Sequence, residues 1–208
     1  MKSKETWKFI HTERSALADT LANLAPEQWS DASWCEGWSV HKVAGHVVAA
    51  AEQTFANFYK ELIMAGFKFD TFTDRGADAL ASVSPEQIVA RLRARTTTSN
   101  HPPAPVMAML GEIIVHGDDI RRPLGLVHHS PEDALIAVAD SWKKTNLLIG
   151  SKRRIVGVSL RATDASWNYG EGPSVEGPLQ SLVLAMTGRK GSHVNLSGDG
   201  VAILASRA

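Results

Sequence analysis

The sequence has only one cysteine, Cys35, among its 208 residues. One cysteine cannot form a disulfide within the chain, and a chain of this length can bury a sizeable core without one. Proteins without structural disulfides are typical of a reducing compartment. We therefore expect a cytoplasmic protein.

The sequence also lacks an excess of charge of either sign. Lys and Arg together number 22, as do Asp and Glu, so the formal net charge is zero. Proteins that bind nucleic acids or anionic lipid surfaces usually carry a basic face. The balance therefore predicts no nucleic-acid partner.

Long apolar runs are absent. The most apolar stretch, 43–51, is interrupted by Gly45 and His46, and it falls well short of the roughly 18 residues that a membrane span needs. The N-terminus has an acidic residue at Glu5 and no apolar core, unlike a secretory signal. These absences predict a soluble protein with no membrane partner.

Helical periodicity dominates the first 150 residues. Trp7, Ile10, Leu17 and Leu21 recur at helical spacings, which predicts a helix with one apolar stripe. Capping serines and prolines at first helical positions mark where the other helices begin. The predicted helices cover 3–24, 40–65, 85–95, 105–121 and 131–150.

After residue 154 the pattern changes to β-branched residues and glycine turns. A Ser-Gly-Asp-Gly sequence near the C-terminus is typical of a hairpin turn between two strands. The predicted elements are strands over 155–160, 165–169, 194–196 and 201–204, and a helix over 179–187. The sequence thus predicts an α+β protein, with a helical domain over 1–150 and a small α/β domain over 151–208.

The predicted helix over 105–121 carries polar residues on its apolar face. Glu112 and His116 share this face with Met109, Ile113 and Ile120. A carboxylate that faces a core is costly unless a cation or several donors satisfy it. At a spacing of four residues the two polar side chains project side by side, so they can hold one metal ion.

His46 lies in an otherwise apolar part of the predicted helix over 40–65. Two histidines and one glutamate form the ligand set of many catalytic zinc sites, which leave one position open for water or substrate. The spacing alone leaves two other interpretations open. His46 can be a hydrogen-bonded core residue, and Glu112 with His116 can be only a pair on one helix turn.

Three further residues extend the list of candidates. Asp118 and Asp119 follow His116 directly, and either can orient a ligand imidazole or pair with the arginines that follow. Cys35 is a candidate nucleophile, but a small residue in a tryptophan-rich loop is the favoured interpretation. Trp34 and Trp38, in the same loop, are expected to pack it over the helices.

Three ordered blocks resemble the mycothiol-dependent maleylpyruvate isomerase family, within the larger DinB-like metal-binding superfamily. The first is LAPEQW followed by SWCEGWSVHKVAGH, over 24–46; the second is EIIVHGDDIRRPLG, over 112–125. The third comprises LRATD, TGR and LSGDG in the tail. The resemblance implies an N-terminal four-helix bundle and matches His46, Glu112 and His116 to the family's three metal ligands.

The resemblance also implies a function and cofactors. The expected cofactors are zinc or another divalent metal and a low-molecular-weight thiol, mycothiol or one like it. A metal-bound thiolate can add to a double bond, giving cis–trans isomerisation, or can displace a leaving group in a thiol S-transfer. A metal-stabilised binding protein without turnover and a zinc hydrolase are the alternatives.

Arg189 is the catalytic candidate that the resemblance suggests. An arginine binds carboxylates through two hydrogen bonds, so this one is suited to hold a small, acidic substrate. Its position after a predicted helix also fits simple compensation of the helix dipole, which is slightly favoured.

Overall fold

A computed structural model of the chain describes residues 1–68, 76–80, 82–147 and 149–208. The chain divides into two compact units, Met1–His128 and His129–Ala208, which are described separately. Within the described residues, no helix is both long enough and apolar enough to cross a lipid bilayer.

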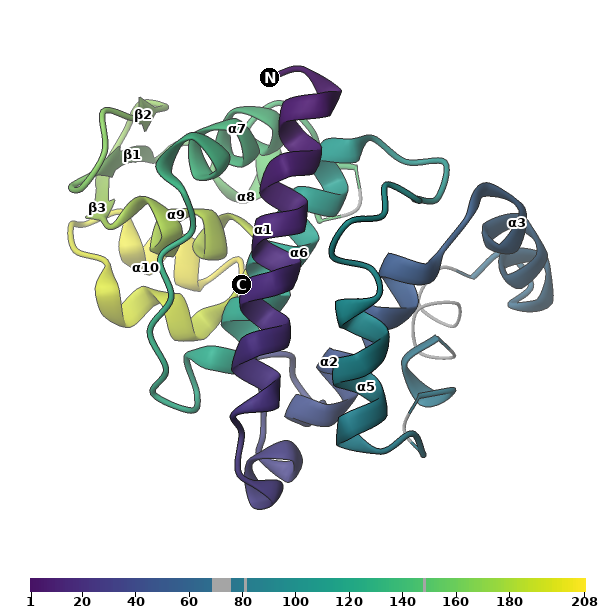
Figure 1. Cartoon of the computed structure of the whole chain (residues 1–208). Helices are drawn as coiled ribbons and strands as arrows, with labels where there is room; N and C mark the ends of the chain where they lie inside the picture. The colour runs from purple at the N-terminus through teal and green to yellow at the C-terminus, as the bar shows by residue number, and fades with distance from the viewer. Residues whose placement is uncertain (69–75, 81, 148) are drawn as a thin grey trace. The chain divides into compact units, whose positions relative to one another are not determined.

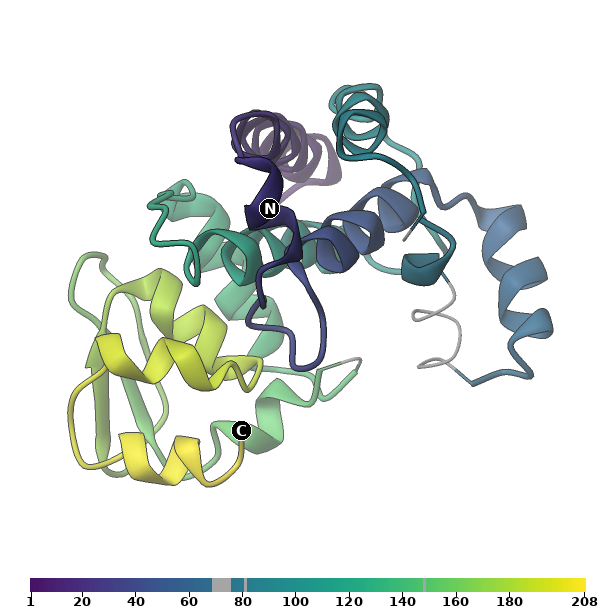
Figure 2. The ribbon, with the colours of Figure 1, turned by 90° about the horizontal axis from the view of Figure 1, so that it is seen from below.

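The first unit is built around four helices: α1 (Ser3–Ala22), α2 (Val40–Glu52), α5 (Pro85–Arg93) and α6 (Val106–Arg121). Helix α1 packs against α5 and α6, and α2 packs against the same two helices. Figure 1 shows α1 lying along α6, and in Figure 2 α1 and α5 are seen nearly end-on. The predicted helical N-terminal domain is therefore confirmed.

The apolar stripes predicted for α1 and α6 form much of the core of this unit. Ile10, Leu17 and Leu21 are almost fully buried on α1, as are Ile113 and Ile120 on α6. Burial of such side chains stabilises each helix by about 1.5–3 kcal/mol per residue. Helix α6 also packs against α2, so Glu112, which shares the apolar face of α6, lies beside α2.

The loop before α2 is held by its own short elements. A 3₁₀ turn, η1 (Pro26–Ser30), follows α1, and an isolated antiparallel bridge then pairs Ala32 with Ser39. The Ser39 hydroxyl accepts a hydrogen bond of 3.2 Å from the backbone N–H of Lys42 and so caps α2. The predicted cap is confirmed, and it fixes the start of the helix that carries His46.

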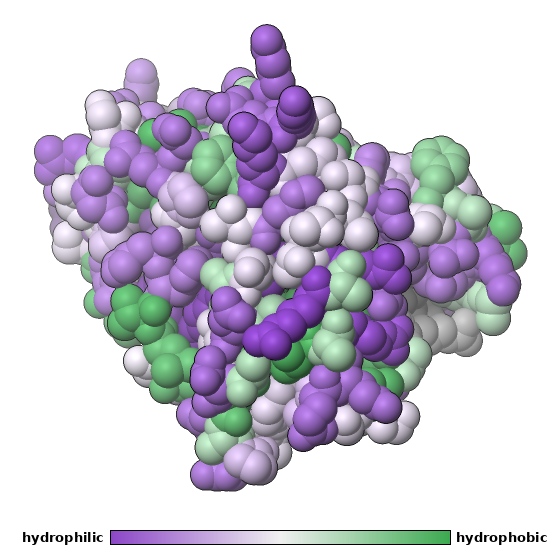
Figure 3. Space-filling view, viewed as in Figure 1, coloured by the Kyte–Doolittle hydropathy of each residue, from purple (hydrophilic) through white to green (hydrophobic). Residues whose placement is uncertain are grey.

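The single helix predicted over 40–65 is wrong. The backbone is extended at Gln53, and Thr54 caps a separate helix, α3 (Phe55–Met64), by accepting from the Asn57 N–H. No residue of α3 is buried. Figure 3 shows apolar side chains exposed over this helix, where Phe55 and Ile63 are each about 60% exposed.

The second unit contains helices, a small sheet and a 3₁₀ turn. Its helices are α7 (Glu132–Trp142), α8 (Ser151–Arg154), α9 (Leu179–Met186) and α10 (Val201–Ala205), with a 3₁₀ turn, η2 (Lys190–Asn195). The helix predicted over 131–150 ends at Trp142, and α7 packs against α9.

The sheet has the strand order β2-β1-β3. Strand β1 (Ser159–Ala162) pairs antiparallel with β2 (Asn168–Tyr169), so the strands predicted over 155–160 and 165–169 are both present, with β1 shifted toward the C-terminus. Strand β3 (Ser174–Gly177) pairs parallel with β1 and was not predicted. The unit is therefore α/β, as expected.

The hairpin predicted over 194–204 is wrong, because its glycines serve close packing. The Gly200 N–H donates to the Ser174 carbonyl at 2.8 Å, and a side chain at Gly198 would meet the same carbonyl oxygen at 2.3 Å. These contacts hold the segment against β3. In place of two strands, the residues before this segment form η2 and the residues after it form α10.

The division between the units falls earlier than the predicted boundary at residue 150. The four helices that pack on one another are complete at Arg121, and α7 packs against α9 of the second unit. The sequence does not reveal this, because α7 has the same helical pattern as the bundle helices.

Candidate metal centre

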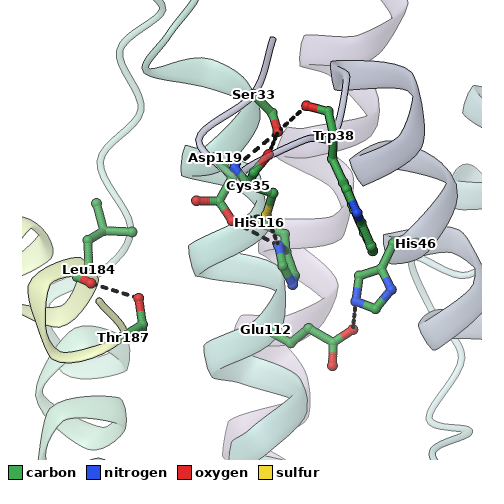
Figure 4. A network of polar contacts seen from close by, with 9 residues as sticks. All are labelled: Ser33, Cys35, Trp38, His46, Glu112, His116, Asp119, Leu184 and Thr187. Atoms are coloured by element: carbon green, nitrogen blue, oxygen red, sulfur yellow. Dashed lines mark hydrogen bonds and ion pairs between the residues drawn. The ribbon is translucent and has the colours of Figure 1, made fainter. Parts of the chain in front are cut away.

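The three predicted ligands come from two packed helices of the first unit. His46 lies on α2, and Glu112 and His116 lie on successive turns of α6. The His46 Nε2 atom is 3.6 Å from Glu112 Oε1, and the rings of His46 and His116 are 4.9 Å apart between centroids. Figure 4 shows the three side chains turned toward one another.

Asp119 determines which nitrogen of His116 is free. The Asp119 Oδ2 atom lies 2.9 Å from His116 Nδ1. A carboxylate only accepts, so Nδ1 carries the hydrogen and donates it. In the neutral ring the lone pair is then on Nε2, the tautomer commonly found in histidine ligands held by a carboxylate.

Asp118 and Asp119 have different partners, although the sequence does not distinguish them. Asp118 accepts a hydrogen bond of 2.8 Å from Nε of Arg122, one turn further along. Asp119 orients His116. Each of the two interpretations left open by the sequence therefore applies to one of these residues.

Burial dominates the electrostatics of Glu112. Desolvation raises the pKa of the Glu112 carboxyl, while the nearby charges of His116 and Arg14 act in the opposite direction. Burial in turn lowers the pKa of Arg14 to about 10, against the favourable charge of Glu112. A carboxylate in these surroundings gains from an additional cation.

The surroundings of His116 favour positive charge. Burial by itself lowers the pKa of the imidazole, but the hydrogen bonds and charges of Asp119 and Cys35 outweigh it and raise the pKa to about 10. A divalent cation beside His116 would take the place of this proton, which is the usual exchange at histidine metal sites.

The tryptophan-rich loop covers the centre. The Trp38 ring meets the His46 ring edge-on, with 5.4 Å between centroids, and the guanidinium of Arg122 lies 5.7 Å from the centre of the Trp34 ring. The Trp34 backbone N–H donates to the Asp119 carbonyl at 3.0 Å. The Ser33 hydroxyl donates to the Trp38 carbonyl at 2.8 Å. The prediction that these tryptophans pack the loop over the helices is confirmed.

Two of the predicted ligands, His46 and Glu112, are spaced as two ligands of one divalent metal would be. Two zinc ligands in a tetrahedral site lie about 3.3 Å apart, close to the observed 3.6 Å between the His46 and Glu112 donors. The carboxylate and the two imidazoles supply the oxygen and nitrogen donors that zinc accepts. His46, Glu112 and His116 would hold the ion, with Asp119 orienting the third ligand.

The described residues of the first unit line a small and a larger cavity. A small one borders Glu112 and Arg14, with apolar side chains of α2 and α6 completing its wall. A larger one, about 340 Å³, lies beside α2, α3 and α5, and its wall includes the Glu52–Arg91 ion pair. The larger cavity is lined by none of the predicted ligands.

Arg189 lies in the second unit, just after α9. Its backbone N–H donates to the Leu184 carbonyl at 3.3 Å, and Gly188, with φ +86°, lets the chain turn after the helix. In the same turn Thr187 donates to the Leu184 carbonyl at 2.7 Å (Figure 4). The substrate role of Arg189 stays a prediction.

Two residues beside the centre, Cys35 and Arg14, are not predicted as part of it from the sequence. The Cys35 thiol donates to Asp119 Oδ2 at 3.1 Å and lies 3.7 Å from His116 Nδ1. Arg14 fills a position in the apolar stripe of α1, where it is only 3% exposed. A charged residue at a core-facing helical position was the available signal for Arg14, whereas no sequence pattern points from Cys35 to α6.

Comparison with known proteins bears on the first unit and on the fold. Residues 10–101 match the family model described as the mycothiol maleylpyruvate isomerase N-terminal domain. The match includes His46, and it ends before Glu112. No curated protein matches the chain by sequence.

Two crystal structures share the fold of the chain. One is the mycothiol-dependent maleylpyruvate isomerase, with a TM-score of 0.61 and 18% identity. The other is a mutant of that enzyme, with a TM-score of 0.63 and 17% identity. Each comparison covers 96% of this chain and 93% of the other, so the likeness extends over both units.

Proposed function

The N-terminal unit belongs to the mycothiol maleylpyruvate isomerase family, and on this premise we propose that the protein is a metal-dependent, thiol-using enzyme. Its substrate would be a small, acidic molecule, and its reaction a cis–trans isomerisation or a thiol S-transfer. The ligand set for the metal would be His46, Glu112 and His116. The proposed thiol is mycothiol or a close chemical relative.

One observation carries this proposal. His116 Nδ1 donates to Asp119, so the lone pair of the neutral ring lies on the side of His46 and Glu112. Together with His46 and Glu112, this nitrogen would give a tetrahedral ion three protein ligands and leave its fourth position free. An arrangement of this kind supports catalysis, because purely structural zinc sites have four protein ligands.

When bound, zinc lowers the pKa of a coordinated thiol, so that a thiolate is available at neutral pH. The protein groups position this chemistry. His46 and Glu112 set the ligand geometry, Asp119 holds the His116 ring, and Trp38 covers His46. Arg189 is proposed to bind a carboxylate of the substrate.

Cobalt substitution tests the thiol. A cobalt–thiolate bond gives a charge-transfer absorption that cobalt–water does not, and Cys35→Ser removes the protein's own thiol from the measurement. We expect the Cys35→Ser protein, loaded with cobalt, to develop the band when mycothiol is added. His116→Ala in the same background should abolish both the band and the thiol-dependent turnover.

Arg189→Ala tests the proposed substrate contact separately from the thiol. It should keep the cobalt–mycothiol band and raise the KM for an acidic substrate. A cobalt protein that shows no spectral change with mycothiol or other cellular thiols would overturn the thiol proposal. If mycothiol binds but no maleyl-type substrate is turned over, the result would favour the alternative of a metal-stabilised binding protein without turnover.

A further inference from the structure

We infer that Cys35, His116 and Asp119 form a second cation site, for a soft or borderline divalent metal such as cadmium or zinc. The site lies on the Nδ1 side of the His116 ring. It is distinct from the proposed catalytic site, which uses Nε2 of the same ring.

The geometry suits a metal. One donor atom from each of the three residues lies within 4.8 Å of the others. Cys35 Sγ is 3.1 Å from Asp119 Oδ2 and 3.7 Å from His116 Nδ1, and the latter two atoms are 2.9 Å apart. Ligands of a tetrahedral zinc ion lie about 3.3–3.5 Å apart, so only shifts of a few tenths of an ångström are needed.

The donor chemistry selects the class of metal. A thiolate with an imidazole and a carboxylate suits zinc and softer ions, and disfavours magnesium and calcium, which prefer oxygen ligands. The Asp119 side chain is fully buried, and Cys35 and His116 are only partly exposed. An ion bound here would be screened from most of the solvent.

The loop holds Cys35 in place before any ion binds. The Ser33 hydroxyl accepts from the Cys35 N–H at 3.1 Å, and the neighbouring Trp34 N–H donates to the Asp119 carbonyl at 3.0 Å. Figure 4 shows Cys35 beside Asp119 at the end of this loop. Little chain entropy is therefore lost when the ion binds.

The two sites compete for one ring. The two nitrogens of an imidazole point in different directions, so one ion cannot reach both donor sets. A neutral ring has one lone pair, so binding at Nδ1 moves the proton to Nε2, while the Cys35 thiol releases its proton to solvent. An ion bound beside Cys35 therefore weakens binding at the His46 side.

Cadmium is the probe that separates the sites, because a cadmium–thiolate bond absorbs in the ultraviolet and Cys35 is the only cysteine. We expect metal-free full-length protein without added thiol to develop this band on cadmium titration. Cys35→Ser, which keeps a hydroxyl near Asp119, should lack it. His46→Ala should keep it, with half-saturation at the same or a lower cadmium concentration.

His116→Ala and Asp119→Asn test whether the three residues act together. Each should raise the cadmium concentration for half-saturation by at least about tenfold, and circular dichroism checks that each variant is folded. Absence of the band in the wild-type protein would overturn the proposal. So would a band that both variants leave unchanged, since Cys35 would then bind cadmium alone. Weaker zinc binding in His46→Ala, with the cadmium band retained, separates this site from the catalytic one.

Discussion

At the residue scale, the Asp119 carboxylate connects the two faces of the centre. It accepts from His116 Nδ1 and from the Cys35 thiol, and is itself fully buried. A buried acceptor of this kind fixes both the tautomer and the orientation of the ring. The tautomer and orientation of His116 therefore depend on Asp119, which would not contact an ion bound at Nε2 of that ring.

We expect Asp119→Asn to lower the affinity for zinc by about 10–100-fold, because the charged acceptor that holds His116 is lost. Competition with a chromogenic chelator measures this affinity. Asp118→Asn is the matched control, since Asp118 pairs with Arg122, and it should leave zinc binding nearly unchanged. Equal losses in the two variants would contradict the role of Asp119.

His193 gives the second unit a predicted pH dependence. Burial lowers the pKa of its imidazole, and among the described residues its buried Nε2 has no hydrogen-bond partner. The unfolded chain, with a pKa of about 6.5, therefore takes up a proton at higher pH than the folded protein. The stability that the neutral, folded His193 contributes is fully present above the pKa of the unfolded chain. It is lost as the pH falls toward the lower pKa of the folded protein.

On going from pH 7 to pH 5, we expect the free energy of unfolding of the wild-type protein to fall relative to that of His193→Gln, because only the wild-type protein carries this imidazole. Urea unfolding at the two pH values measures both proteins, and groups other than His193 contribute equally to each. The same pH dependence in the two proteins would show that His193 is not the group responsible.

At the element scale, the small sheet depends on glycines with positive φ. Gly170 has φ +88°, and a Cβ there would meet the Val158 carbonyl oxygen at 2.3 Å. Gly157 has φ +74° with nothing within 4 Å of a Cβ. The two residues separate the cost of the backbone conformation from the cost of a clash.

We expect Gly157→Ala to destabilise the protein by about 1–2 kcal/mol, from the left-handed conformation alone. Gly170→Ala should cost about 1–3 kcal/mol more, because the backbone beside β1 must also move. Urea unfolding of the two variants measures the difference. Equal losses would mean that the chain relaxes around Gly170 at no cost.

At the scale of the whole molecule, the metal is expected to stabilise the bundle. An ion at about 100 times its dissociation constant adds about 2.7 kcal/mol, which corresponds to a change in Tm on the order of 5–10 °C. Chelation should lower the Tm by this amount. Glu112→Gln should show a smaller response, since it removes a ligand and a buried charge. An unchanged melt after confirmed metal loss would contradict the proposed site.

The division of the chain into two units predicts which N-terminal fragment folds by itself. A fragment of residues 1–128 should fold and bind one zinc ion, because α1, α2, α5 and α6 pack on one another. A fragment of residues 1–150 carries α7 without α9, against which α7 packs, and should be less soluble. Metal analysis and size-exclusion chromatography test both. Zinc binding by the longer fragment alone would favour the boundary at residue 150.

The sequence by itself determined most of the helices of the bundle and the face that carries Glu112 and His116. Both follow from local rules, since apolar periodicity and capping act within a few residues. The Ser84 cap, which accepts from the Gln87 N–H at 3.4 Å, is one example. The resemblance to a known family then connected His46 with α6 across 66 residues of chain, which periodicity alone does not do.

Only the tertiary structure decided the features that depend on contacts between distant segments. The contact of Cys35 with Asp119, the pairing of β3 with β1 and the packing of α7 on α9 each join parts of the chain that share no local pattern. The roles of the glycines at 198 and 200 depend on such contacts too, because both residues lie against the Ser174 carbonyl. A glycine that permits close packing against another strand and one that permits a hairpin turn look alike in the sequence, because both simply lack a side chain.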